Sequence, residues 1–228
     1  MSITKPLLGA IGGMGTQASG RFYEMLHGMQ SVTSEQEYLD VLLYSMPSIP
    51  DRTAYITGQS SDDPLRPLLH AARTLETAGA SLLAMPCVTA HYFYDDLANA
   101  VDIPFLNMPE ETARFIAERD IEKVGLLATD GTLSSKIFHT AFEKRGIDVL
   151  VPSNEVQSNL MAIIYDVKRG VIVLPETLYP TVAEPLKAGA EAVILGCTEL
   201  CIIAKKNPDV VNTLEVLAEA SLRDCRVQ

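Results

Sequence analysis

The sequence has no tryptophan and no compositionally biased tract. Hydrophobic residues make up 47% of the 228 positions and charged residues 21%, a balance that lets the chain bury a substantial core. The 14 glycines and 13 prolines follow no short repeat, which excludes a collagen-like chain. We therefore expect an ordinary globular protein rather than a disordered or fibrous one.

Positive charge is scarce. Eighteen lysines and arginines stand against 29 aspartates and glutamates, for a formal net charge of −11, and the cations form no cluster in either half of the chain. Because binding to a polyanion needs a basic surface, nucleic acid is not expected as a partner. A small anionic substrate remains compatible with this composition, since a few local cations can hold it.

Long apolar runs are also lacking. No uninterrupted stretch approaches the roughly 18 to 20 residues that span a bilayer, so no membrane partner is expected. The first apolar run, residues 7–11, stops at Gly12-Gly13 and is too short for a signal peptide. We therefore predict a cytoplasmic protein, in which the four cysteines would be reduced. They are Cys87, Cys197, Cys201 and Cys225.

Short apolar runs alternate with helical patterns along the whole chain. The expected strands are residues 6–11, 38–45, 81–85, 123–128, 148–151 and 192–195. The expected helices are residues 16–29, 64–78, 89–100, 134–145 and 155–169, with another that starts near Thr198. Such alternation predicts an α/β fold with parallel sheets and helices on both faces.

An internal repeat indicates two similar domains. The tripeptide Ala-Gly-Ala at 78–80 precedes an apolar run and Cys87, and the same tripeptide at 188–190 precedes Cys197, an offset of 110. Gly15-Thr16 and Gly131-Thr132 follow two other expected strands at an offset of 116. We therefore predict two similar parallel-sheet α/β domains, related by pseudo-twofold symmetry, with an active-site cleft between them.

The expected boundaries follow from the repeat. Residues 1–106 and 208–228 would form an N-terminal domain that carries Cys87, and residues 107–207 a C-terminal domain that carries Cys197. The chain would cross over near 107–122 and return after Pro208, where a C-terminal helix over about 208–228 would close the first domain.

The two cysteines at equivalent positions suggest the chemistry. Each follows a strand and precedes a helix, and ligands of open α/β sheets bind at that edge. A helix start lowers the pKa of a thiol, so we expect Cys87 and Cys197 to form thiolates. One could remove a proton from a carbon and the other return one to the opposite face, which is racemisation. The alternative is that both are inert core cysteines.

Five stretches resemble the cofactor-independent aspartate/glutamate racemases and cover nearly the whole chain in order. They are Ala10-Ile11-Gly12-Gly13-Met14-Gly15, Ile49-Pro50-Asp51-Arg52-Thr53-Ala54, Met85-Pro86-Cys87-Val88-Thr89-Ala90-His91, Thr129-Asp130-Gly131-Thr132 and Leu195-Gly196-Cys197-Thr198-Glu199-Leu200. The resemblance implies a PLP-independent amino-acid racemase, an isomerase that acts on aspartate, glutamate or both. It also implies Cys87 and Cys197 as the two catalytic bases, no cofactor, no metal, and a homodimer.

The resemblance also implies a set of substrate-binding residues. Arg52 and Lys168 match cationic positions that face the substrate carboxylates, although Arg52 could instead form a loop salt bridge and Lys168 a solvated helix end. The other implied contacts are Met14, Val88, Thr89, Thr132, Thr198 and Glu199. Val88 stands where this family usually has asparagine, and valine has no amide for hydrogen bonds. Altered specificity, or a catalytically weak amino-acid-binding homologue, is therefore an alternative.

Other hypotheses compete with the racemase. Residues 13–18 fit a dinucleotide-binding pattern, but the expected strand 38–45 lacks the acidic end that this motif requires. Cys87, His91, Cys197 and Cys201 could together hold zinc, although Cys201 lies in an apolar run. His91 could instead tune Cys87 or be purely structural. A different isomerase or a decarboxylase could use the same scaffold, but such relatives commonly lose one of the two cysteines.

Overall fold

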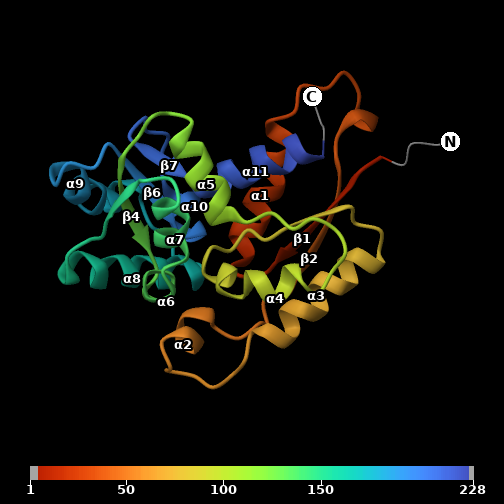
Figure 1. The fold of residues 1–228 in the computed structure, drawn as a ribbon, viewed down its shortest axis with the longest axis horizontal. Helices are drawn as coiled ribbons and strands as arrows, with labels where there is room; N and C mark the ends of the chain where they lie inside the picture. The colour runs from red at the N-terminus through yellow and green to blue at the C-terminus, as the bar shows by residue number, and fades with distance from the viewer. Residues whose placement is uncertain (1–4, 226–228) are drawn as a thin grey trace.

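The computed structural model describes residues 5–225 and contains two parallel sheets (Figure 1). The first sheet has the order β2-β1-β3, and the second β5-β4-β6-β7. Its strands are β1 (Leu7–Gly12), β2 (Asp40–Ser45), β3 (Leu82–Ala84), β4 (Lys123–Ala128), β5 (Asp148–Leu150), β6 (Ala192–Gly196) and β7 (Val210–Asn212). All neighbouring strands pair in parallel, which confirms the predicted fold class.

The two sheets repeat one arrangement. In each, the first strand along the chain is central, with the second strand on one side and the third on the other. β1 and β4 both have six residues and start 116 positions apart, and β3 and β6 start 110 positions apart. The offsets that the sequence shows therefore correspond to two copies of one strand order. We call the elements from β1 to α4 the first half and those from α5 to β7 the second half.

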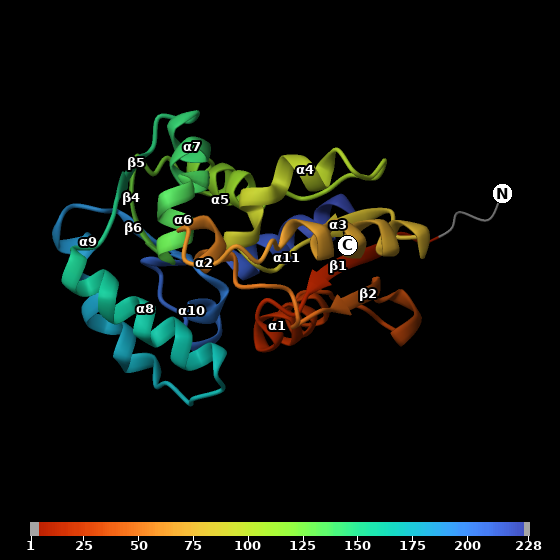
Figure 2. The same cartoon turned by 90° about the horizontal axis from the view of Figure 1, so that it is seen from below.

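Helices connect and cover the strands of both sheets. In the first half they are α1 (Thr16–Gly28), α2 (Arg52–Ile56), α3 (Leu65–Thr77) and α4 (Tyr94–Ala98), with 3-10 turns at Glu35–Glu37 and Thr89–Phe93. In the second half they are α5 (Met108–Ala117), α6 (Asp130–Ser135), α7 (Ile137–Glu143), α8 (Asn154–Lys168), a 3-10 turn at Pro175–Leu178, α9 (Tyr179–Lys187) and α10 (Thr198–Ile203). The last helix is α11 (Thr213–Asp224). Figure 2 shows α1 and α3 on opposite sides of β1, and α2 beside α6 of the other half.

Several elements differ from the sequence expectation. The helix expected over 134–145 is interrupted at Lys136, whose φ of 56° lies in the left-handed region, so α6 ends before it and α7 begins after it. The expectation missed α2, α5 and α9. Helix α9 has Pro185 inside it, which local propensity disfavours. Pro185 packs closely against β4, because a Cβ added to Gly125 would lie 2.4 Å from the Pro185 Cβ.

The return of the chain also differs. Val210–Asn212 forms β7 beside β6 in the second sheet, and α11 begins only at Thr213. The prediction that residues from 208 onward leave the second half is thus wrong for this strand, because its backbone hydrogen bonds go to β6. Helix α11 packs against α1 and α5, as Figure 1 shows. The rest of the predicted domain division stays a prediction, and its residues 1–4 and 226–228 lie outside the described part.

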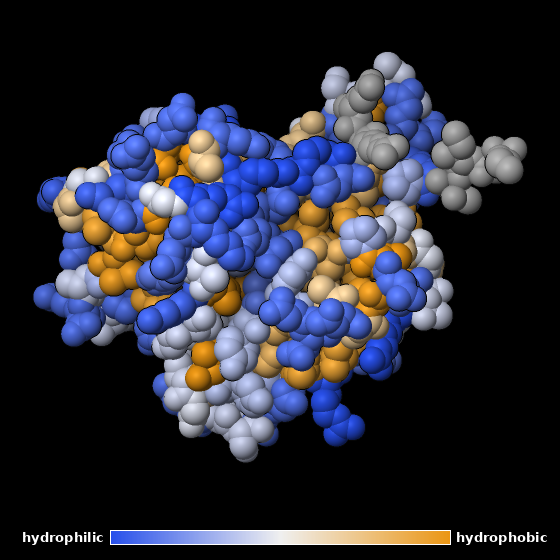
Figure 3. All heavy atoms as spheres, viewed as in Figure 1, coloured by the Kyte–Doolittle hydropathy of each residue, from blue (hydrophilic) through white to orange (hydrophobic). Residues whose placement is uncertain are grey.

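The core is apolar and the surface mixed. Phe22, Phe138 and Phe142 are among the largest fully buried side chains. Hydrophilic side chains cover much of the face in Figure 3, with apolar side chains visible between them. Within residues 5–225, no helix is long and apolar enough to cross a membrane.

Candidate active site

Cys87 and Cys197 occupy equivalent places in the two halves. Cys87 follows β3, and Cys197 directly follows β6 and is the N-cap residue of α10. Both side chains are buried, and both line one cavity between the halves. The structure thus brings the two thiols to a common cleft from opposite sides of the repeat.

The same cavity collects the other residues that the sequence singled out. Met14, Arg52, Val88, Thr89, Lys168, Thr198 and Glu199 line it, whereas Thr132 does not. Its volume is about 10 Å³, close to the smallest space that holds one water molecule. The cleft is therefore closed, and an amino acid enters it only when its walls separate.

Cys197 has a carboxylate partner. Its Sγ donates a hydrogen bond to Glu199 Oε2 at 3.0 Å. Burial and the negative charge of Glu199 raise the pKa of the Cys197 thiol well above its ordinary value, and the opposing effect of Lys168 is smaller. The expectation of a lowered pKa is thus wrong for Cys197, because burial and the carboxylate outweigh the start of the six-residue helix α10. A raised pKa favours the thiol form of Cys197, which can donate a proton.

Unpaired polar atoms surround the cavity. Among residues 5–225, six buried side-chain nitrogen or oxygen atoms lack a hydrogen-bond partner. Three of the six, Arg52 Nε, Thr53 Oγ1 and Glu199 Oε1, belong to residues that line the cavity. Such groups are costly to bury unpaired, so their concentration here marks a place where a polar ligand would satisfy them.

Arg52 and Lys168 both supply positive charge to the cavity wall. Arg52 begins α2, is 7% exposed, and donates from Nη1 to the carbonyl oxygens of Ile49 and Pro50. Within the described residues it forms no salt bridge, so the loop-salt-bridge alternative is not what the structure contains. Arg52 therefore brings an unneutralised cation to the cavity wall.

Lys168 is the last residue of α8, and its Nζ lies 3.6 Å from Asp51 Oδ2. Burial alone would lower the pKa of Lys168, but the acidic groups of Cys197, Glu199 and Asp51 raise it overall. Lys168 is thus a charged wall residue rather than a solvated helix end.

Thr132 takes part in a contact between the halves instead of lining the cavity. The hydroxyl oxygens of Thr89, Thr129 and Thr132 lie 3.0 Å from one another, and all three side chains are buried. Gly131 permits the close approach, because a Cβ there would come within 2.9 Å of Thr53 Cα. The prediction that Thr132 lines the cleft is therefore replaced by a structural role beside it.

The glycines of the first turn are explained by contacts within the chain. Gly13 has a φ of 95°, and a Cβ there would lie 2.4 Å from the backbone of Met46. A Cβ on Gly15 would come within 2.9 Å of Glu199 Oε1. β2 ends at Ser45 without an acidic residue, so the dinucleotide-binding hypothesis gains no support.

His91 and Cys201 have structural partners. His91 Nδ1 donates to the carbonyl oxygen of Cys87 at 2.9 Å, and its Nε2 accepts from the Met108 N–H at 3.2 Å. Burial lowers the pKa of His91 to about 4, which keeps the ring neutral. Cys201 Sγ lies 3.6 Å from Leu195 O and from Thr213 Oγ1. No group of three or more metal-binding side chains occurs within the described chain, so the zinc hypothesis gains no support from the structure.

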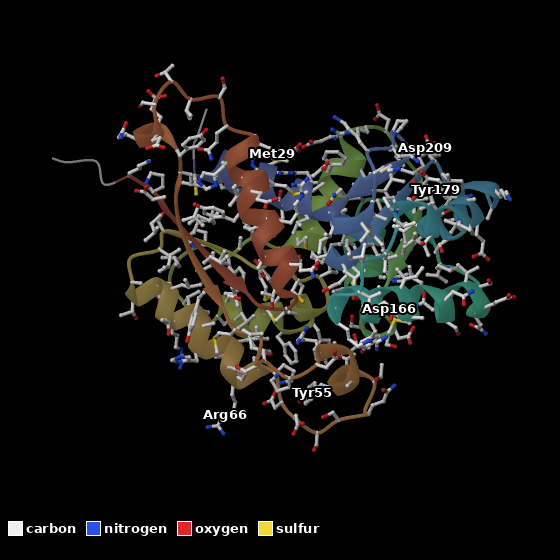
Figure 4. All side chains as sticks on the ribbon, turned by 180° about the vertical axis from the view of Figure 1, so that it is seen from behind. Met29, Tyr55, Arg66, Asp166, Tyr179 and Asp209 are labelled. Carbon is white, nitrogen blue, oxygen red and sulfur yellow. The ribbon has the colours of Figure 1, made fainter. Side chains whose placement is uncertain are left out.

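Sequence reasoning missed Thr53, Asp51 and Tyr165 as members of the site. Thr53 lines the cavity, and Tyr165 donates its hydroxyl hydrogen to Asp51 Oδ1 at 3.5 Å. Thr53 and Asp51 flank Arg52 in a stretch that the resemblance had matched, which was the available signal. Figure 4 shows α2, which carries Tyr55, beside the end of α8, which carries Asp166. Asp51 and Lys168 meet at this junction.

Comparison with known families extends the picture. A family profile described as Asp/Glu/Hydantoin racemase matches residues 11–220. The chain is 24% identical over 200 residues to the broad specificity amino-acid racemase RacX of Bacillus subtilis (strain 168), covering 85% of this chain and 86% of that one.

Solved structures of similar architecture also include racemases. The aspartate racemase of Picrophilus torridus is 28% identical, with a TM-score of 0.86 over 98% of this chain and 95% of that one. An aspartate racemase homologue from Pyrococcus horikoshii OT3 is 26% identical, with a TM-score of 0.78 over 97% and 99% of the two chains. The likeness thus extends across both halves of the chain.

Proposed function

Because the chain belongs to the Asp/Glu/hydantoin racemase family and is an amino-acid racemase, we propose that it interconverts the L and D forms of aspartate, glutamate or both. In this proposal Cys87 and Cys197 act as two bases on opposite faces of the substrate. The observation that carries it is that two thiols from equivalent positions of the repeat line the same closed cavity.

The proton inventory follows from the geometry. A Cys87 thiolate takes the Cα proton of one enantiomer, and the Cys197 thiol donates its proton to the opposite face. The forward turnover leaves Cys87 as a thiol and Cys197 as a thiolate, so in the reverse direction Cys197 takes the Cα proton and Cys87 returns one. Glu199 Oε2, 3.0 Å from the Cys197 sulfur, accepts a hydrogen bond from the thiol form of Cys197. Each turnover thus moves one proton from substrate to the thiolate and one proton from the thiol to product. This chemistry requires neither PLP nor a metal.

The unpaired atoms complement an acidic amino acid. Arg52 Nε can donate to a substrate carboxylate, where negative charge grows as the Cα proton leaves. Lys168 supplies a second cation for the other carboxylate, and Glu199 Oε1 can accept from the α-ammonium group. Thr53 Oγ1 can donate or accept, so it suits either part of the substrate.

A second candidate is an amino-acid racemase of broader specificity. Val88 is 1% exposed, lines the cavity and belongs to the apolar core. Its apolar side chain replaces the asparagine amide that the resemblance implies. An apolar substrate side chain would therefore leave no amide without a hydrogen-bond partner there. The name of the Bacillus subtilis relative, a broad specificity amino-acid racemase, is consistent with this candidate.

A homodimer, a cytoplasmic location and the two-domain division also remain proposals, which rest on the resemblance and the sequence pattern.

The test is α-proton exchange in D₂O. The reduced protein is incubated with each L- and D-amino acid, and proton NMR follows loss of the α-proton while chiral chromatography follows inversion. Exchange with inversion for aspartate or glutamate supports the proposal. Exchange with inversion mainly for apolar amino acids supports the second candidate, and no exchange with any amino acid overturns both.

A further inference from the structure

A larger pocket lies directly outside the catalytic cavity. Its volume is about 210 Å³, and we call it the outer pocket, formed mainly by Gly15–Gln17, Lys168, Arg169 and Glu199. Lys168 and Glu199 also line the catalytic cavity, so these two side chains form the wall between the two spaces. The outer pocket is thus adjacent to the reaction site.

The outer pocket gathers positive charge. The first turn of α1, a helix of 13 residues, borders it, and no side chain caps the first N–H groups of that helix. Free N–H groups and the helix dipole favour an anion at this end. Lys168 and Arg169 add two cations at the end of α8. This combination suits the carboxylates of a small acid.

Glu199, which lines both spaces, adds a second observation that points to a ligand. The residue is 3% exposed, its Oε1 has no hydrogen-bond partner, and this oxygen faces Gly15, where an added Cβ would lie 2.9 Å away. The uncapped first turn of α1 and an unpaired carboxylate oxygen therefore both border the pocket, near Gly15. An ammonium group would satisfy that oxygen. Carboxylate and ammonium together describe a zwitterionic amino acid.

The catalytic cavity is too small for a substrate to reach it directly from solvent, so an adjoining pocket such as the outer pocket is needed. At about 10 Å³ it has no room for an amino acid, and α2 closes another side through the contact of Asp51 with Lys168. The three buried hydroxyl groups of Thr89, Thr129 and Thr132 also contact one another between the halves. Lys168 stands in the wall that the two spaces share, so passage there requires its ammonium group to leave Asp51.

We propose that the outer pocket is a binding subsite for the amino-acid substrate, from which the substrate enters the catalytic cavity past Lys168. Its carboxylates contact the start of α1 and Arg169, and its ammonium group contacts Glu199. The substrate class rests on the proposed function. The subsite itself is defined by charge and position, and it adds an entry route that the two-thiol chemistry does not specify.

A charge variant tests the subsite. Arg169→Ala removes a cation from the outer pocket, and Arg21→Ala is its matched control, because each arginine is exposed and pairs with an acidic residue three positions away on its helix. We expect Arg169→Ala to lower kcat/KM for aspartate about tenfold, to leave kcat nearly unchanged and to weaken the dependence of kcat/KM on salt. Arg21→Ala should match the wild type. Equal kcat/KM and equal salt dependence in the two variants would overturn the proposal.

A steric variant tests the route. Gln17→Trp places a bulky ring at the outer pocket, and Glu24→Trp places the same ring elsewhere on α1, both at exposed positions. The first should lower kcat/KM well below the second, and equal values would overturn the route. If the wild type exchanges no α-proton, the proposed function fails by itself. Calorimetric titration of the same four variants with aspartate then decides the subsite: weaker binding confined to Arg169→Ala and Gln17→Trp supports it, and uniform or absent binding contradicts it.

Discussion

Asp51 and Lys168 meet beside the catalytic cavity, with 3.6 Å between Oδ2 and Nζ. Asp51 also caps α2, because its Oδ1 accepts from the Ala54 N–H at 2.9 Å. Burial opposes ionisation of Asp51, but Lys168 and the cap hydrogen bonds hold its pKa below the ordinary value. The Asp51 carboxylate therefore fixes the start of α2 and also pairs with Lys168, the cation that a substrate carboxylate would need.

This pairing predicts that Asp51 competes with substrate. Asn keeps the capping oxygen but removes the charge, so Asp51→Asn should lower KM for aspartate up to about fivefold, the range of a partly exposed ion pair. The kcat should change little, and steady-state kinetics separates the two constants. Asp63→Asn, which alters another aspartate that accepts a backbone N–H, is the control. A raised KM in Asp51→Asn would mean instead that Asp51 positions Lys168 for substrate.

The paired thiols predict two equivalent losses. Cys87→Ser and Cys197→Ser should each reduce racemisation of aspartate by at least about 10³-fold, since neither hydroxyl replaces a thiolate base at neutral pH. Cys201→Ser is the matched control, because Cys201 is equally buried but does not line the cavity, and its Sγ lies 3.6 Å from Leu195 O and from Thr213 Oγ1. Circular dichroism checks that all three variants fold. Full racemisation by either catalytic variant would contradict the two-base mechanism.

The sequence predicted the parts of the fold that depend on strong local patterns. β1 and β4 are buried apolar runs that end in glycine-rich turns, so their positions and their common offset were readable without a structure. Cys87 and Cys197 could be assigned to one cleft for the same reason. Two copies of one strand order place equivalent strand ends toward each other.

Features that depend on tertiary contacts were not predictable in this way. Pro185 disfavours a helix by local propensity, so α9 depends on tertiary packing, including that of Pro185 against Gly125. The raised pKa of Cys197 depends on burial and on the rotamer that turns Glu199 toward it, neither of which a spacing reveals. Asp51 and Lys168 are far apart in sequence, and their contact follows from the way α2 docks at the end of α8.

His91 predicts a loss of stability in acid. Its pKa is lowered from 6.5 to about 4 in the folded protein, so the unfolded chain binds the proton more tightly. The stability that neutral His91 contributes is complete above about pH 6.5 and is lost as the pH falls toward 4, up to about 3 kcal/mol. Urea unfolding at pH 7, 6, 5 and 4 measures it.

The matched variants for this prediction are His91→Gln and His70→Gln. The first removes the buried ring and should flatten the decline between pH 6.5 and 4, even if it lowers stability at pH 7. The second changes an exposed histidine and should leave the decline intact. A decline of the same size in both variants would assign the acid sensitivity to carboxyl groups instead.

Glu199 predicts a shift in the ionisation of Cys197. The negative charge of Glu199 raises the pKa of the Cys197 thiol, and its Oε2 accepts a hydrogen bond from that thiol. Glu199→Gln should therefore lower the pKa of Cys197, while burial still holds this pKa above the ordinary value. The rate of Cys197 alkylation, followed by mass spectrometry against pH, should therefore rise at lower pH than in the wild type. Glu110→Gln, which breaks surface ion pairs with Lys144 and Arg145, is the control. The same variant should raise KM for aspartate, because the amide loses charge attraction for the substrate ammonium. An unchanged alkylation profile together with an unchanged KM would remove Glu199 from both roles and leave its unpaired Oε1 without a ligand.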